Sequence, residues 1–203
     1  MTLGGTERYR QLEGQVPDLV WHGVLAAREL DFPLCVHPGT GRLLAVLAGG
    51  LERGSTVVET GTGTGVGLAW MVNAADPGVS FVSVELDADR AVAAAAVFER
   101  RSNVTVVRGD AADHWYAHRP DLLVLDGGGG AGKTGDEPID IRQALAPRGT
   151  VTVDDMTPTD AWPPQYEGAD DVAKLYWLEH PDLHTTEVQV APDCSVLVGR
   201  LLR

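Results

Sequence analysis

A run of alternating glycines constrains this chain more than any other feature. An apolar stretch ends at the acid Glu59, and glycine then occupies every second position over residues 61–67. Because glycine lacks a Cβ, such a turn lets a ligand approach the backbone N–H groups closely. The dinucleotide fingerprint G-x-G-x-x-G fails in every register, because its third glycine position falls on Val66, Leu68 or Trp70. The run therefore predicts a strand-to-helix turn that binds a different nucleotide-type cofactor.

Composition narrows the class of protein. The length of 203 residues favours one domain over residues 1–203, with a helical preface over 1–53 and the core over 54–203. The formal charge of −13 argues against nucleic-acid or anionic-membrane binding, since either requires a basic surface. No apolar run approaches a membrane span, and the polar start predicts no signal peptide. Cys35 and Cys194 are far apart, which favours reduced thiols and a cytoplasmic location.

Apolar runs alternate with helical patterns along the chain. Strands are expected over residues 55–59, 81–85, 104–107, 122–125 and 150–153, followed by a closing pair over 185–190 and 195–201. Helices are expected over residues 6–12, 17–30, 41–51, 64–75, 87–101, 111–118, 139–145 and 170–180. This order predicts a three-layer, doubly wound α/β domain whose sheet of seven strands is mostly parallel, with an antiparallel last strand and N-terminal helices in front.

Acids stand at the carboxyl ends of all five expected parallel strands. They are Glu59, Glu85, Asp110, Asp126 and the pair Asp154-Asp155. An open parallel sheet binds its ligand outside these ends, and buried strand ends do not carry carboxylates without a partner. Glu85 lies at the interval after the glycine turn where an acid meets ribose hydroxyls. The alternative is that each acid only caps the helix that follows it. Capping can explain any single acid, but it explains less well why all five strands end in one.

Several segments resemble a known family. The stretch from Glu59 to Gly65 resembles motif I of the class I S-adenosylmethionine (SAM) methyltransferases. The segments 36–44, 83–87, 109–111 and 145–150 look like the catechol and caffeoyl-CoA type O-methyltransferases, a resemblance over about residues 34–160. It implies a Rossmann-like fold, SAM as cofactor and in-line methyl transfer to a hydroxyl oxygen of a small molecule. The expected cofactor-binding residues are Glu59, Gly61, Thr62, Gly63, Gly65, Glu85, Leu86, Asp110, Ala111 and Asp126.

The same resemblance implies a divalent cation held by Asp126, Asp154 and Asp155. Oxygen-only ligands suit Mg²⁺, although the family has Asn where Asp155 stands. The family's lysine base lies where this chain has glycines, and Lys133 is displaced along the loop. Lys133 is one candidate base, and His37, beside the expected entrance, is another. The expected catalytic residues are therefore Asp126, Lys133 and His37.

Other functions stay open from the sequence. Residues 127–134 satisfy the phosphate-loop pattern G-x-x-x-x-G-K-[ST] of NTPases, but the next residues, 135–138, are a poor start for the helix that must face the phosphates. One alternative is a metal-independent N- or O-methyltransferase, in which the three acids hold the acceptor. The other two are an NTPase and a SAM-binding module without catalysis. The expected partners are a small-molecule acceptor and a second copy of the chain in a homodimer, with no nucleic acid and no membrane.

Overall fold

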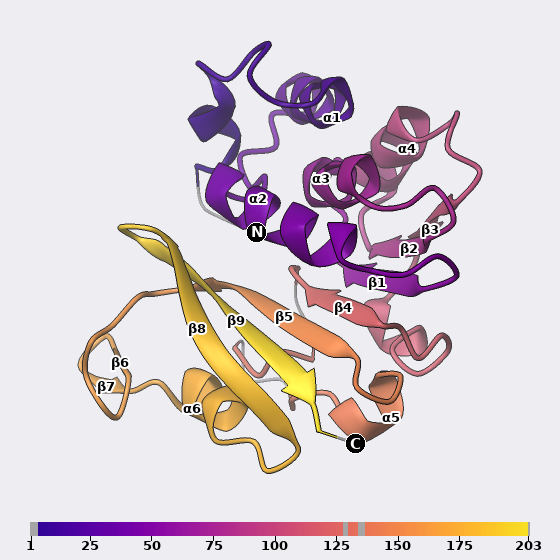
Figure 1. Ribbon diagram of the computed structural model, residues 1–203. Coiled ribbons are helices and arrows are strands. Elements are labelled where there is room, and N and C mark those ends of the chain that lie inside the picture. The colour runs from indigo at the N-terminus through magenta and orange to yellow at the C-terminus, as the bar shows by residue number, and fades with distance from the viewer. Residues whose placement is uncertain (1–3, 128–129, 134–136, 203) are drawn as a thin grey trace.

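One seven-stranded sheet organises the chain (Figure 1). The computed structural model describes residues 4–127, 130–133 and 137–202. In the described part the strand order is β3-β2-β1-β4-β5-β9-β8; β1 to β5 run parallel, and β9 is antiparallel to both β5 and β8. The strands are β1 (Thr56–Thr60), β2 (Ser80–Glu85), β3 (Val104–Arg108), β4 (Leu122–Leu125), β5 (Thr150–Met156), β8 (Leu183–Ala191) and β9 (Cys194–Leu201). The predicted fold class is confirmed.

Helices cover both faces of this sheet (Figure 1). One face carries η1 (Thr6–Tyr9), α1 (Asp18–Glu29), α2 (Pro38–Gly49), α3 (Val66–Ala74) and α4 (Ala88–Val97). The other face carries α5 (Ile141–Ala144) and α6 (Val172–Leu178), and a small hairpin of β6 (Gln165–Tyr166) and β7 (Ala169–Asp170) lies beside α6. Among the described residues, no helix is long and apolar enough to cross a membrane.

The central strands are apolar because both of their faces are covered. In β4 all four side chains are buried, and they alternate between the two cores: Leu122 and Val124 join the core under α3, and Leu123 and Leu125 join the core under α6. Such a continuous apolar run is typical of a strand inside a three-layer α/β sheet. The switch in strand order falls between β1 and β4, so both carboxyl ends open into the same crevice.

Three local predictions were wrong. The helix expected over residues 111–118 is a 3-10 turn, η2 (Ala111–Asp113), and the chain soon turns through Arg119, which has a φ of 43°, and Pro120. The hairpin of β6 and β7 was not predicted. Strand β5 does not end before its acids but continues through Asp154 and Asp155 to Met156, with a shift of register against β9. A β-bulge of this kind leaves no mark on a period-two apolar pattern.

Candidate active site

The glycine turn between β1 and α3 forms the floor of the site. Gly61, Gly63 and Gly65 all have left-handed φ values of 86°, 55° and 86°, which side chains other than glycine rarely adopt. A Cβ on Gly61 would stand 2.4 Å from Gly127 Cα and 2.8 Å from the carbonyl oxygen of Asp126. The turn after β1 and the end of β4 are therefore in backbone contact, and only glycine fits between them.

Glu59 is buried beneath this turn. Its exposed fraction is 1%, and Oε2 accepts a hydrogen bond of 2.5 Å from Ser83 Oγ, which also contacts Thr62 Oγ1 at 2.6 Å. Burial raises the pKa of Glu59 to about 8; the Ser83 hydrogen bond opposes the rise and the Asp126 carboxylate adds to it. Such a carboxyl group is well placed for a cationic ligand, which would favour its ionised form.

Glu85 at the end of β2 holds the glycine turn as well as facing it. Its Oε2 accepts the Gly63 N–H at 2.8 Å, while Oε1 accepts the Asp87 N–H and both Nε and Nη2 of Arg90, at 3.1 and 2.8 Å. Each carboxylate oxygen has two lone pairs, so Oε2 can accept one further hydrogen bond from a ligand hydroxyl. The predicted ribose-binding acid thus also stabilises the ligand-free turn.

Asp126 and Asp154 bring two carboxyl groups together at the ends of β4 and β5. Both are buried, with exposed fractions of 5% and 2%. Asp154 Oδ1 accepts a hydrogen bond of 3.2 Å from Thr40 Oγ1, whereas Oδ2 has no hydrogen-bond partner in the described part of the chain. Burial, followed by the charge of Asp154, raises the pKa of Asp126 to about 7. Asp126 therefore retains its proton close to neutral pH.

Asp155 does not join this pair. It is exposed and sits at the bulge with a φ of 59°. Within the described ranges, no group of three or more His, Cys, Asp and Glu side chains is arranged to hold a metal ion. The described residues therefore do not show the predicted triad of Asp126, Asp154 and Asp155 as a metal site: the first two are buried, and Asp155, the next residue along β5, is exposed.

The two candidate bases lie in different surroundings. Lys133 reaches the end of β5, where its Nζ donates a hydrogen bond to the carbonyl oxygen of Asp154. His37 caps α2: its Nδ1 accepts the Gly39 N–H at 2.9 Å, so Nε2 carries the proton of the neutral ring. Burial lowers the pKa of His37, assisted by Arg8. His37 therefore acts here as a helix cap, and Lys133 is the candidate that reaches the acid pair.

The remaining predicted cofactor residues line the far end of the crevice. Leu86 is 72% exposed directly after Glu85. Asp110 is exposed after β3, and its Oδ1 caps η2 by accepting the Ala112 N–H at 2.9 Å. Ala111 is the first residue of η2. Asp110 therefore caps η2 with one oxygen, as the capping alternative predicts. Its side chain also stays exposed to solvent, so it is still accessible to a ligand.

The phosphate-loop alternative lacks its helix. Gly128, Gly129 and Thr134 lie outside the described residues, but the next helix in the chain, α5, begins only at Ile141 and has four residues. Asp140 caps it with a side-chain oxygen. A phosphate-binding loop needs a helix whose N-terminus directly follows the glycines. The described geometry here does not provide one.

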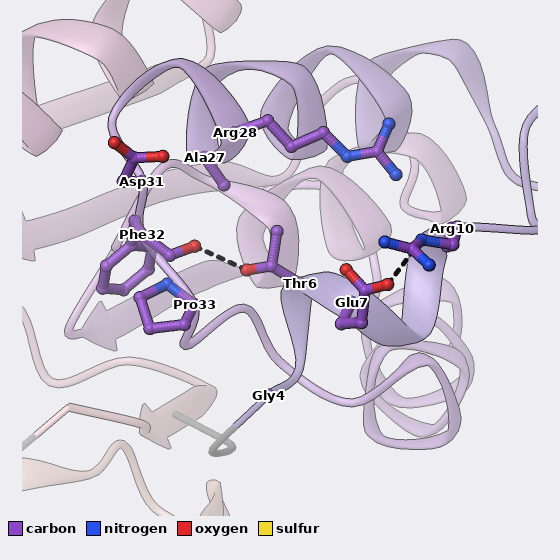
Figure 2. A pocket seen from close by; sticks show the side chains of 9 residues that line it. All are labelled: Gly4, Thr6, Glu7, Arg10, Ala27, Arg28, Asp31, Phe32 and Pro33. Atoms are coloured by element: carbon purple, nitrogen blue, oxygen red, sulfur yellow. Dashed lines mark hydrogen bonds and ion pairs between the residues drawn. The ribbon is translucent and has the colours of Figure 1, made fainter.

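The segment that precedes α2, residues 32–36, covers the glycine turn. Phe32, Leu34, Cys35 and Val36 line a narrow cleft together with the glycine turn, Val66, Gly67 and Asp126. Figure 2 shows a second, more open pocket on the outer side of Phe32, where Glu7, Arg10, Arg28 and Asp31 gather and the Phe32 carbonyl accepts a hydrogen bond of 2.6 Å from Thr6 Oγ1. Phe32 therefore separates the cleft from this outer pocket.

Four contributors to the site were not predicted from the sequence. Phe32 covers the turn, Thr40 and Ser83 donate to buried carboxylates, and Arg90 pairs with Glu85. Ser83 gave a signal, because it is a polar residue between apolar neighbours in a buried strand. Thr40 and Phe32 gave none, since their contacts join segments far apart in the chain.

The raised pKa values predict how stability depends on pH. The native protein retains the protons of Glu59 and Asp126 up to about pH 7–8, whereas the unfolded chain releases them near pH 4. The free energy of unfolding without ligand should therefore fall between about pH 5 and about pH 8, by on the order of 6 kcal/mol for the two groups together. Urea unfolding at both pH values measures this. Glu59→Gln keeps the shape and removes one titration, so its pH dependence should be shallower; an unchanged slope would contradict the assignment.

The central region of the chain matches a known family model, and the whole fold is similar to solved structures. Residues 58–156 match the family model described as a methyltransferase domain. The O-methyltransferase TomG from Streptomyces achromogenes, solved with SAM, is 20% identical, with 92% of this chain and 91% of that chain covered and a TM-score of 0.68. A methyltransferase from Geobacter sulfurreducens is 24% identical over 100% and 99%, with a TM-score of 0.69. An O-methyltransferase from Bacillus cereus, in complex with SAH, is 15% identical over 97% and 98%, with a TM-score of 0.70. No curated protein matches this sequence.

Proposed function

Residues 58–156 match a methyltransferase domain, and from this premise we propose that the chain is a class I SAM-dependent enzyme that methylates a hydroxyl oxygen of a small molecule. The observation that carries the proposal is the buried pair of Asp126, which lines the cofactor cleft, and Asp154, whose buried Oδ2 has no hydrogen-bond partner among the described residues. Two of the similar structures are O-methyltransferases crystallised with SAM or SAH. These names support an oxygen acceptor without identifying it.

The cofactor fits the cleft by charge and by backbone geometry. The sulfonium and ammonium groups make SAM cationic at its methionine end, and Glu59 and Asp126 are the buried carboxylates there: a Cβ on Gly67 would stand 2.8 Å from Glu59 Oε1 and 3.9 Å from Asp126 Oδ2. At the other end, Glu85 Oε2 offers its free lone pair to a ribose hydroxyl. Asp110 and Ala111 would meet the adenine edge at the end of β3.

The acid pair supplies the proton acceptor. The acceptor hydroxyl would donate to the unpartnered Asp154 oxygen as its own oxygen attacks the methyl carbon. The bond from methyl carbon to sulfur breaks, its electron pair stays on sulfur to give S-adenosylhomocysteine, and the hydroxyl proton passes to the carboxylate pair. Burial raises the pKa of the neighbouring Asp126 to about 7, so this second carboxyl group can take up a proton near the working pH. Alignment of acceptor and methyl group supplies the rest of the rate.

The proposed reaction does not use magnesium. Of the three predicted ligands, Asp126 and Asp154 lie together, but Asp155 is exposed on the bulge, so the described residues do not fit the ion. The Lys133 ammonium donates to the Asp154 carbonyl and brings a positive charge to the same strand end. The proposed reaction therefore follows the metal-independent alternative.

An activity assay with and without metal tests the proposal. Radiolabelled SAM is incubated with a panel of phenols, 3,4-dihydroxybenzoate and aromatic amines, in EDTA and in excess Mg²⁺, and products are identified by mass spectrometry. We expect an O-methylated product at equal rates in both conditions. Product only with Mg²⁺ would restore the metal site, and an N-methylated product would change the acceptor atom. SAM binding by calorimetry without product from any class would contradict the proposed activity.

A further inference from the structure

A fully buried lysine lies outside the site described above. Lys174 in α6 has an exposed fraction of 0%, and its Nζ donates to the Thr157 carbonyl at 2.5 Å and to Glu187 Oε1 on β8 at 2.8 Å. Ser195 on β9, also fully buried, has one hydroxyl that can donate to the same Glu187 oxygen or to the Met156 carbonyl at 3.1 Å. A buried charge persists only with such partners. Lys174, Glu187 and Ser195, the lysine cluster, are thus built into the fold.

The lysine cluster holds the end of β5 directly beyond its bulge. The register between β5 and β9 shifts between Val153 and Met156, and Asp155 between them has a φ of 59°. Asp adopts this left-handed conformation more readily than most residues other than glycine, and here it coincides with the shift of register. The carbonyl groups of the next two residues, Met156 and Thr157, are the ones that the cluster can bind. The bulge between Val153 and Met156, which contains Asp154 and Asp155, is therefore anchored at its C-terminal end.

Besides the contacts of Lys174, helix α6 contacts the loop that leads to Lys133. Trp177 lies one turn after Lys174 on the same helix and is 1% exposed. Its Nε1 donates to the Ala131 carbonyl at 2.9 Å, and the loop from Ala131 leads to Lys133, whose Nζ binds the Asp154 carbonyl. One helix is thus joined to both segments that flank Asp154.

From these contacts we infer that Lys174 and Glu187 are positioning residues that hold Asp154 at the angle required for proton transfer. This inference rests on the proposed function, in which Asp154 takes the proton of the acceptor hydroxyl. The cluster acts through the backbone of Met156 and Thr157, since these carbonyls fix the bulge and the bulge fixes Asp154. A displacement of about 1 Å at a reacting group can cost on the order of a hundredfold in rate. The glycine turn, to which the proposal assigns SAM, follows β1, hydrogen-bonds to Val84 and Glu85 of β2 and contacts the end of β4.

The test uses Lys174→Met paired with Glu187→Gln in the full chain. Methionine keeps the length of the lysine stem, and glutamine removes the charge that would otherwise be left unpaired. With 3,4-dihydroxybenzoate as acceptor probe, we expect kcat to fall at least about tenfold, with SAM affinity within about twofold by calorimetry. Hydrogen exchange in the peptide over residues 150–157 should accelerate at least about tenfold. Leu183→Ala is the matched control: it removes a buried side chain at the opposite end of the β8–β9 hairpin.

The outcomes separate the inference from the proposed function. A merely structural role predicts that the double variant and Leu183→Ala lose stability alike while keeping kcat per folded molecule; that result would overturn the inference. Equal loss of SAM affinity and kcat in the double variant would also overturn it, because the effect would then be global. If the wild-type enzyme does not methylate the probe, the acceptor class fails instead, and hydrogen exchange still decides whether the cluster holds the bulge.

Discussion

Gly61→Ala should abolish detectable SAM binding. The added Cβ would stand 2.4 Å from Gly127 Cα and 2.7 Å from Gly127 N, and both obstacles are backbone atoms that cannot rotate away. The turn after β1 and the end of β4 would have to separate, and this separation moves Asp126 and the turn that faces the cofactor. We expect an affinity loss of at least about a hundredfold, since misplacement of this size removes several contacts together. Titration calorimetry with SAM and S-adenosylhomocysteine measures it.

Gly54→Ala separates this effect from backbone strain. Gly54 has a φ of 93°, close to the 86° of Gly61, but a Cβ there would meet nothing within 4 Å. Both variants therefore carry the cost of a left-handed alanine, about 1–2 kcal/mol. Gly54→Ala should lower the melting temperature with unchanged SAM affinity. If both variants lost affinity alike, the loss would come from strain or reduced stability, and the glycine turn would no longer be assigned to the cofactor.

The position of the acids could be predicted because parallel strands fix it. An acid that ends a buried strand at the carboxyl edge must face the crevice, whatever the helices do. Glu59, Glu85 and Asp126 are placed in this way, and each is nearly inaccessible to solvent. The alternating glycines were equally informative, because left-handed φ values at Gly61, Gly63 and Gly65 follow from the residue type.

The partners of these acids could not be predicted, because they depend on tertiary contacts. Arg90 pairs with Glu85 only because α4 begins beside β2, and Thr40 meets Asp154 across 114 positions of the chain. The bulge in β5 is the most consequential case. Successive side chains of a strand point to opposite faces, and the shift of register near Asp155 leaves no mark in the sequence. Asp154 is therefore buried and Asp155 exposed, although the sequence presents them as a pair.

That difference predicts the largest loss of turnover. Asp154→Asn keeps the size of the side chain and its contact with Thr40, but removes the carboxylate whose unpartnered Oδ2 we propose as the proton acceptor. General bases contribute about 10²–10⁴-fold to rate, so kcat should fall within that range. SAM affinity should change little, because Glu59, Glu85 and the glycine turn are untouched. Steady-state kinetics with saturating SAM, together with calorimetry, check both parts.

Asp155→Asn makes the same chemical change one residue further along β5. Asn tolerates the left-handed conformation that Asp155 has at a φ of 59°, so the bulge should be kept. If the acid pair acts without a metal, this variant should retain turnover within about twofold, as expected for an exposed substitution away from the reacting groups. A comparable collapse in both variants, reversed by excess Mg²⁺, would mean that the three acids do converge on an ion when the acceptor is bound. The contrast between two neighbouring carboxylates therefore decides how the acceptor hydroxyl loses its proton.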